Sequence, residues 1–198
     1  MYINKKQRSP AIDYSFPGLY FVTICTKNKT HLFGKIENGE MILNERGRIA
    51  HNVWNELINH FENIKLYDFI VMPNHIHGII NILNTERTEG YDSDRVIKQK
   101  RIQKLPVIIS SYKSAVSREI NKISGEKIFA WQSSYYDRLI RNEEEFDALS
   151  VYIVKNPLNW ENDIEYNEYQ DKSIKNIMKS EIHKYYEEVV NGKYRQKM

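Results

Sequence analysis

The chain has 198 residues, of which 41% are hydrophobic and 28% charged, and its net charge is +3. This length and composition suit one folded domain with an appended segment, and they exclude an intrinsically disordered chain. No apolar run approaches the ~20 residues of a bilayer-spanning helix. The single Cys25 excludes an internal disulfide, and residues 1–14 lack the apolar core of a signal peptide, so we expect a cytoplasmic protein.

The first half of the chain predicts strands, a hairpin and one helix. Strands, which favour β-branched and aromatic residues, are expected at 19–27, 31–36, 41–43, 64–72 and 75–83. Asn38-Gly39, between the second and third of these strands, is a good hairpin signal. Apolar residues recur every three or four positions from Asn44 to Phe61, which predicts a helix.

The second half predicts mainly helices. Residues 84–103 are polar and charged, and we expect an exposed loop there. A helix follows over Pro106–Ile123, and residues 128–141 are expected to be extended. Asn142 is a favourable N-cap for a third helix, whose first turn carries three acids. A final helix is expected near Ile174–Val190.

Strands alternating with flanking helices predict an α+β fold in which a sheet has helices packed on one face. The ferredoxin-like or RNA-recognition-motif-like plan, with an antiparallel sheet, is the one we expect. This domain should span residues 1–160, and residues 161–198 should form a C-terminal helical extension whose role the sequence leaves open.

Basic residues are concentrated in two places. Nine Lys and Arg against two acids lie between Arg95 and Lys127, and five against Asp13 alone lie in residues 1–29. Because phosphate contacts dominate the affinity of proteins for nucleic acids, this distribution favours a polyanionic partner. A solvated charged face is the alternative interpretation.

Residues 71–80, VMPNHIHGII, place two histidines in an otherwise apolar stretch. In a strand, the side chains of His75 and His77 project from the same face and that of Ile76 projects from the other. Two imidazoles side by side are suited to form half of a divalent-metal site. A hydrogen-bonded pair of core histidines is the alternative.

The helix after Asn142 offers a complement to the histidines. Tyr152 and Asn156 are four residues apart, so they lie together at the margin of its apolar face. They could place a nucleophile beside a metal-coordinating oxygen. Because Asn156 precedes Pro157, which biases it out of helical geometry, this requires the helix to persist to its last residue. An amphipathic edge residue and a helix-end cap are the alternative.

Several motifs together resemble one known family. The stretch MPNHIHGII, preceded by the strand YFVTICT, resembles the HUH motif of single-tyrosine transposases, in particular the REP-associated tyrosine transposase branch. The match continues, in the same order, through SSYKSAVSREIN and WQSSYYDRLIRNEEEFDALSVYIVKNP. It spans roughly residues 10–160, and the combination is far more specific than the histidine pair alone.

The resemblance implies a nuclease and strand transferase that acts on single-stranded DNA. His75 and His77 would hold Mg²⁺ or Mn²⁺, and Tyr152 would attack the scissile phosphate to form a 5′-phosphotyrosine link. Asn156 stands where the wider superfamily has a glutamine that completes the metal site. The expected partner is single-stranded or hairpin DNA, bound by a monomer or a homodimer.

Further residues are candidates for contacts to that DNA. Basic side chains would contact phosphates, and aromatic rings would stack on unpaired bases. These candidates are Lys98, Lys100, Arg101, Lys104, Lys113, Arg118, Trp131, Tyr135 and Tyr136. Each could equally serve packing or lie on a solvated surface.

Two other functions are open on the sequence. One is a non-catalytic, hairpin-DNA-binding regulatory protein on the same fold. The other is an RNA-binding module with a ferredoxin-like sheet, which rests on fold analogy and basic charge. This last hypothesis leaves Tyr152 and the histidine pair without a role.

Overall fold

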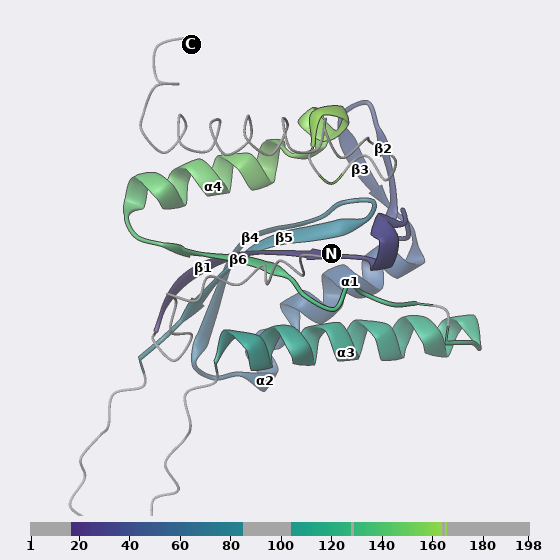
Figure 1. The fold of residues 1–198 in the computed structure, drawn as a ribbon, viewed down its shortest axis with the longest axis horizontal. Helices are drawn as coiled ribbons and strands as arrows, with labels where there is room; N and C mark the ends of the chain where they lie inside the picture. The colour runs from purple at the N-terminus through teal and green to yellow at the C-terminus, as the bar shows by residue number, and fades with distance from the viewer. Residues whose placement is uncertain (1–16, 85–103, 128, 164, 166–198) are drawn as a thin grey trace, which may run out of the picture.

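The computed structural model describes residues 17–84, 104–127, 129–163 and 165. Its main sheet has four strands in the order β4-β5-β1-β6, and every neighbouring pair is antiparallel (Figure 1). The strands are β1 (Gly18–Cys25), β4 (Ile64–Val71), β5 (His75–Ile82) and β6 (Tyr136–Ile140). The α+β class and the antiparallel, ferredoxin-like sheet are therefore confirmed.

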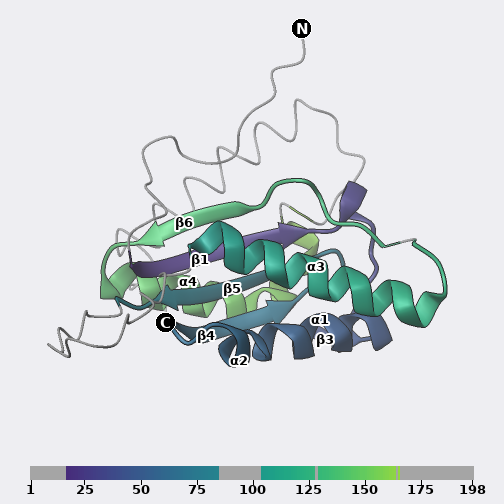
Figure 2. The same ribbon diagram turned by 90° about the horizontal axis from the view of Figure 1, so that it is seen from below.

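Helices cover both faces of this sheet. In Figure 1, α1 (Glu45–Asn55) and α3 (Leu105–Ser124) lie below the strands, and α4 (Glu143–Lys155) lies above them. Figure 2 shows α1 and α3 side by side across their common face. The expectation that all helices pack on one face holds for α1 and α3 but is wrong for α4.

The central strands explain the second helix layer, because both of their faces are apolar. On β1, Tyr20 and Val22 join the core between the sheet and the helices α1 and α3. Phe21, between them, joins Ile79 and the α4 residue Ile153 in a second cluster on the opposite face. Since side chains alternate along a strand, an almost continuous apolar run has to be covered on both sides.

A separate two-stranded sheet lies beside the main one. It consists of β2 (Gly34–Glu37) and β3 (Glu40–Leu43). The two turn residues between them, Asn38 and Gly39, have φ angles of 52° and 77°. A type I′ turn requires positive φ at both central positions, so the hairpin expected from Asn-Gly is confirmed.

The first residues of α4 are tied to the neighbouring strand. Asn142 Oδ1 accepts a hydrogen bond from the Glu145 backbone N–H at 2.8 Å, which confirms the N-cap. Glu145 is only 2% exposed and forms an ion pair with Arg138 of β6. Its carboxylate also accepts a hydrogen bond from the Arg141 backbone at 2.7 Å. The start of α4 is therefore fixed against β6.

Other expected elements differ in extent. The helix expected up to Phe61 is divided into α1 and a short α2 (Leu57–His60). Among the described residues of the expected extended stretch 128–141, one strand is found, β6. The expected loop 84–103, apart from its first residue, and the expected final helix lie outside the described residues. Within the part of the chain that is described, no helix is both long and apolar enough to cross a membrane.

Gly78 of β5 provides space for an aromatic pair. The rings of Trp54 and Phe69 stack with centroids 4.4 Å apart, and a Cβ on Gly78 would lie 2.4 Å from the Trp54 ring. We expect Gly78→Ala to lower the free energy of unfolding by about 1–3 kcal/mol, because the packed rings would have to move. Urea unfolding measures this change. Ser111→Ala, at an exposed position of α3, is the control and should change stability by less than ~0.5 kcal/mol.

Candidate active site

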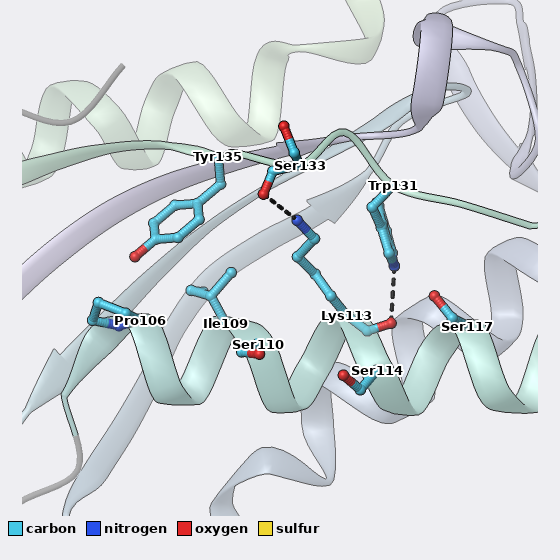
Figure 3. Close-up of a pocket in the computed structure, with 9 residues that line it drawn as sticks. All are labelled: Pro106, Ile109, Ser110, Lys113, Ser114, Ser117, Trp131, Ser133 and Tyr135. Carbon is cyan, nitrogen blue, oxygen red and sulfur yellow. Dashed lines mark hydrogen bonds between the residues drawn. The ribbon is translucent and has the colours of Figure 1, made fainter. Parts of the chain in front are cut away.

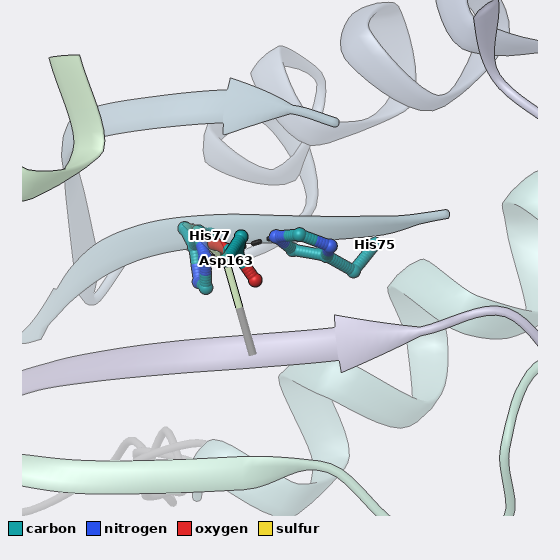
Figure 4. A group of neighbouring side chains, drawn as sticks. All are labelled: His75, His77 and Asp163. Carbon is teal, nitrogen blue, oxygen red and sulfur yellow. Dashed lines mark hydrogen bonds between the residues drawn. The ribbon is translucent and has the colours of Figure 1, made fainter. Parts of the chain in front are cut away.

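His75 and His77 project from the face of β5 that α4 covers. Their Nε2 atoms lie 2.9 Å apart, and the side chains are fully buried (Figure 4). Burial lowers the pKa of His75 to about 4 and the pKa of His77 to about 3, because a charged ring would lose its hydration. Both rings are therefore neutral near pH 7, which is the form that binds metal ions.

Each histidine is oriented through its other ring nitrogen. His75 Nδ1 lies 2.7 Å from Asn74 Oδ1, and His77 Nδ1 lies 2.8 Å from Thr23 Oγ1. Thr23 is the residue of β1 that pairs with His77 across the sheet. The ring of Phe21 stacks on His77, with centroids 5.3 Å apart. These contacts leave the two Nε2 atoms facing each other.

Asp163 brings a carboxylate to the histidine pair (Figure 4). One ligand atom from each of His75, His77 and Asp163 lies within 4.8 Å of the other two, and all three residues are buried. Two imidazoles and a carboxylate are a donor set that divalent metal ions accept. Sequence reasoning missed Asp163, since it lies beyond residue 160 in an acid-rich stretch where nothing distinguishes it from Glu161.

Tyr152 and Asn156 reach the same carboxylate from α4. The Tyr152 hydroxyl donates to Asp163 Oδ2 at 3.3 Å and lies 3.1 Å from His77 Nε2. Asn156 Nδ2 donates to Asp163 Oδ2 at 2.8 Å. Asn156 keeps helical angles (φ −57°, ψ −41°) despite the proline that follows it. The two side chains therefore lie on the same side of the helix, as their spacing predicts.

The amide oxygen of Asn156 tests whether these residues fit a metal ion. This Oδ1 atom is buried and has no hydrogen-bond partner among the described residues. An unsatisfied buried acceptor costs about 1–3 kcal/mol, and a cation is one partner that would remove the cost. The Nε2 atoms of His75 and His77 and the Asp163 carboxylate are a donor set that fits a divalent ion, and the unpartnered Asn156 oxygen belongs to the amide that contacts this carboxylate.

The segment after α4 covers the histidines. It begins with the 3₁₀ helix η2 (Pro157–Asn162), whose Trp160 ring lies against His75 with centroids 5.9 Å apart. Further on, the Glu165 carboxylate pairs with Lys29 at 2.5 Å, and its backbone carbonyl accepts a hydrogen bond from Asn74 at 2.6 Å. These contacts hold the intervening Asp163 against the histidine pair.

Of the basic residues expected to contact DNA, three are described, and these lie on α3 or just before it. Lys98, Lys100 and Arg101 fall outside the described residues. Lys104 is exposed just before α3, and the exposed Arg118 pairs with Glu119 at 3.1 Å. The remaining candidate, Lys113, donates to the backbone carbonyl of Gln132 at 2.6 Å. Phosphate binding by these side chains stays a prediction.

The aromatic candidates lie near a cavity of about 400 Å³ between α3 and the segment before β6 (Figure 3). Trp131 and Tyr135 line it but are only 9% and 4% exposed, because their rings join the core between α3 and the sheet. Trp131 also donates through Nε1 to the Lys113 carbonyl at 3.1 Å. Tyr136, 47% exposed, offers the largest accessible ring of the three, and base stacking by any of them stays a prediction.

No family model matches the chain. A Haemophilus influenzae protein, described only as uncharacterized, is 34% identical over 158 residues, which cover 76% of this chain and 86% of that protein. The chain belongs to the family of this protein. The alignment covers most of both chains, so the similarity is not confined to one segment of either protein.

Two solved structures have a similar fold at low sequence identity. A REP-associated tyrosine transposase bound to a REP hairpin has a TM-score of 0.49 and 16% identity, covering 77% of this chain and 74% of that one. A candidate transposase from Deinococcus radiodurans has a TM-score of 0.41 and 14% identity, covering 74% of this chain and 95% of that one.

Asp163 should contribute to the affinity of the site for a divalent ion. We expect Asp163→Asn to weaken Mn²⁺ binding by about tenfold or more, because it removes an anionic donor beside two neutral rings. Isothermal titration calorimetry measures the affinity. Glu161→Gln removes an equal charge from an exposed position two residues away and is the matched control. Equal affinities for Asp163→Asn and Glu161→Gln would contradict a role for this carboxylate in metal binding.

Proposed function

We propose that this protein is a metal-dependent single-strand DNA nuclease and strand transferase, of the kind that carries out DNA transposition, with Tyr152 as its nucleophile. One observation carries the proposal. The Tyr152 hydroxyl lies within hydrogen-bond distance of both His77 Nε2 and Asp163 Oδ2, at 3.1 and 3.3 Å. A phenol next to a metal-binding donor set is the arrangement that metal-assisted attack on a phosphate needs.

The donor set indicates what an ion would do there. His75, His77 and Asp163 would hold Mg²⁺ or Mn²⁺, with Asn156 Oδ1 as a further donor. The ion would polarise the scissile phosphate and stabilise the charge that develops on its oxygens. The resident side chains would orient this phosphate beside the Tyr152 hydroxyl, so that nucleophile and target meet with little further ordering.

The chemistry of Tyr152 follows from its contacts. Its hydroxyl proton has an acceptor in Asp163 Oδ2, to which it already donates. The phenolic oxygen would form a bond to phosphorus as its proton passes to Asp163, and the bond from phosphorus to the 3′-oxygen would break. That oxygen would take the proton from Asp163 and leave as a 3′-hydroxyl. A later 3′-hydroxyl would attack the phosphotyrosine and release Tyr152. Because the covalent link conserves the phosphodiester bond energy, rejoining needs no nucleotide cofactor.

The substrate class we propose is hairpin DNA with an adjacent single strand, as the motif resemblance implies. The exposed Lys104 and Arg118 would contact phosphates, together with the basic residues just before α3. The exposed ring of Tyr136 is placed to stack on an unpaired base. The protein would bind this DNA as a monomer or as a homodimer.

A non-catalytic, hairpin-DNA-binding protein on the same fold is the second candidate. The burial of the donor set favours it, since His75 is 0% and His77 2% exposed. A scissile phosphate would have to pass the covering segment around Trp160 to reach these rings. A protein that only binds DNA has no such requirement.

Covalent capture of DNA separates the two candidates. Labelled single-stranded DNA hairpins, incubated with the protein and Mn²⁺, should give an adduct that survives a denaturing gel. Tyr152→Phe should abolish the adduct and leave hairpin binding unchanged, because only the attacking oxygen is lost. His77→Ala should also abolish it through the metal site.

Tyr67→Phe removes the same hydroxyl from a tyrosine of β4 that is 42% exposed, and it is the matched control. It should retain the adduct. Hairpin binding without an adduct in the wild type would favour the non-catalytic candidate. An adduct that persists in Tyr152→Phe would show that another residue is the nucleophile.

A further inference from the structure

Asn74 determines which nitrogen of His75 carries the ring proton. The Asn74 amide nitrogen donates to two backbone carbonyls, those of Lys29 at 3.1 Å and Glu165 at 2.6 Å. The amide oxygen therefore faces His75 Nδ1, at 2.7 Å. Since an amide oxygen can only accept, Nδ1 of His75 must carry the proton and donate it. A neutral His75 then presents a bare Nε2.

This assignment fixes the proton of His77 as well. The two Nε2 atoms are 2.9 Å apart, a distance at which two bare nitrogens would repel each other, so one proton lies between them. The Tyr152 hydroxyl, 3.1 Å from Nε2 of His77, donates its own proton to Asp163 and does not supply this one. Because Nε2 of His75 is bare, this proton belongs to Nε2 of His77. A neutral His77 then has a bare Nδ1, and the Thr23 hydroxyl at 2.8 Å must donate to it. In the metal-free protein the two histidines are therefore opposite tautomers.

A metal ion requires the other tautomer of His77. Imidazole binds an ion through a lone pair, so an ion held by both Nε2 atoms needs both to be free of protons. The proton of His77 would then be on Nδ1, and the ring would remain neutral. The Thr23 hydroxyl can satisfy this tautomer too, because it can rotate to accept where it previously donated. Thr23 is 7% exposed, so water does not readily take its place.

We propose that Thr23 is a positioning residue that allows His77 to carry its proton on Nε2 in the metal-free protein and on Nδ1 when the site holds an ion. Asn74, by contrast, keeps His75 in one tautomer throughout. His75 therefore has its metal-binding tautomer before an ion binds, whereas His77 changes its tautomer on binding. This inference rests on the metal site of the proposed function.

Nuclear magnetic resonance of protein with ¹⁵N-labelled histidine reads the proton positions directly. In the metal-free protein we expect a protonated Nδ1 in His75 and a protonated Nε2 in His77. Addition of Zn²⁺, a diamagnetic probe, should move the His77 proton to Nδ1 and leave His75 unchanged. Metal-free His77 with its proton already on Nδ1 would overturn the proposal.

Two substitutions of Thr23 test its hydroxyl by calorimetry with Zn²⁺. Thr23→Val keeps the shape of the side chain but has no hydroxyl, and it should weaken binding by about 10–100-fold. Thr23→Ser keeps the hydroxyl and should bind close to wild type. Tyr112→Phe removes another fully buried hydroxyl, which donates to the Ala50 carbonyl at 3.0 Å in the core on the other face of the sheet, and controls for loss of stability.

The outcomes separate this inference from the proposed function. Wild-type affinity in Thr23→Val would overturn the role of Thr23 and leave the metal site intact. Absence of both Zn²⁺ and Mn²⁺ binding in the wild-type protein would remove the metal site and the role of Thr23 together. Binding with the expected tautomer change but no DNA adduct would support the inference and count against the proposed catalysis.

Discussion

The pairing of β1 with β5 is the constraint on which the site depends. The two strands pair without interruption from Gly18 opposite Ile82 to Cys25 opposite His75. A shift of one residue would turn every side chain of β5 to the other face of the sheet. Both histidines would then lie on the face that α1 and α3 cover. The observed register instead sets Phe21 and Thr23 beside His77. Apolar packing on both faces of β1 holds that register, so the hydrophobic core also positions the polar site.

Burial gives this site its chemical character. Neutral imidazoles, a carboxylate and an amide lie together where little water can screen them, so each polar atom needs a defined partner. Asn74 illustrates this, since its amide joins a histidine to two backbone carbonyls. Asn156 Oδ1 is the contrasting case, because its lone pairs are unused. A network of this kind stabilises one arrangement of the side chains and leaves one buried acceptor without a partner among the described residues.

Local rules explain which features the sequence could predict. Strand alternation placed His75 and His77 on one face, and helical spacing placed Tyr152 beside Asn156. The Asn-Gly turn and the Asn142 cap follow equally from short-range chemistry. Asp163 could not be predicted in this way, because the path of the chain after α4 brings it to the histidines. The side on which α4 packs, and the burial of Trp131 and Tyr135, likewise depend on contacts between distant elements.

The attachment of α4 to β6 has a mechanical consequence for Tyr152. Asn142 and Glu145 anchor one end of the helix, and Tyr152 lies ten residues beyond the cap. At 1.5 Å per residue, the part of α4 between Asn142 and Tyr152 is roughly 15 Å long. A tilt of the helix by about 5° at its anchored end would therefore displace the phenol by about 1.3 Å. For the nucleophile proposed above, a displacement of that size would lower the rate by about 10²-fold. The attachment to β6, together with the packing of Ile153 against Phe21 and Ile79, therefore limits the movement of the Tyr152 hydroxyl.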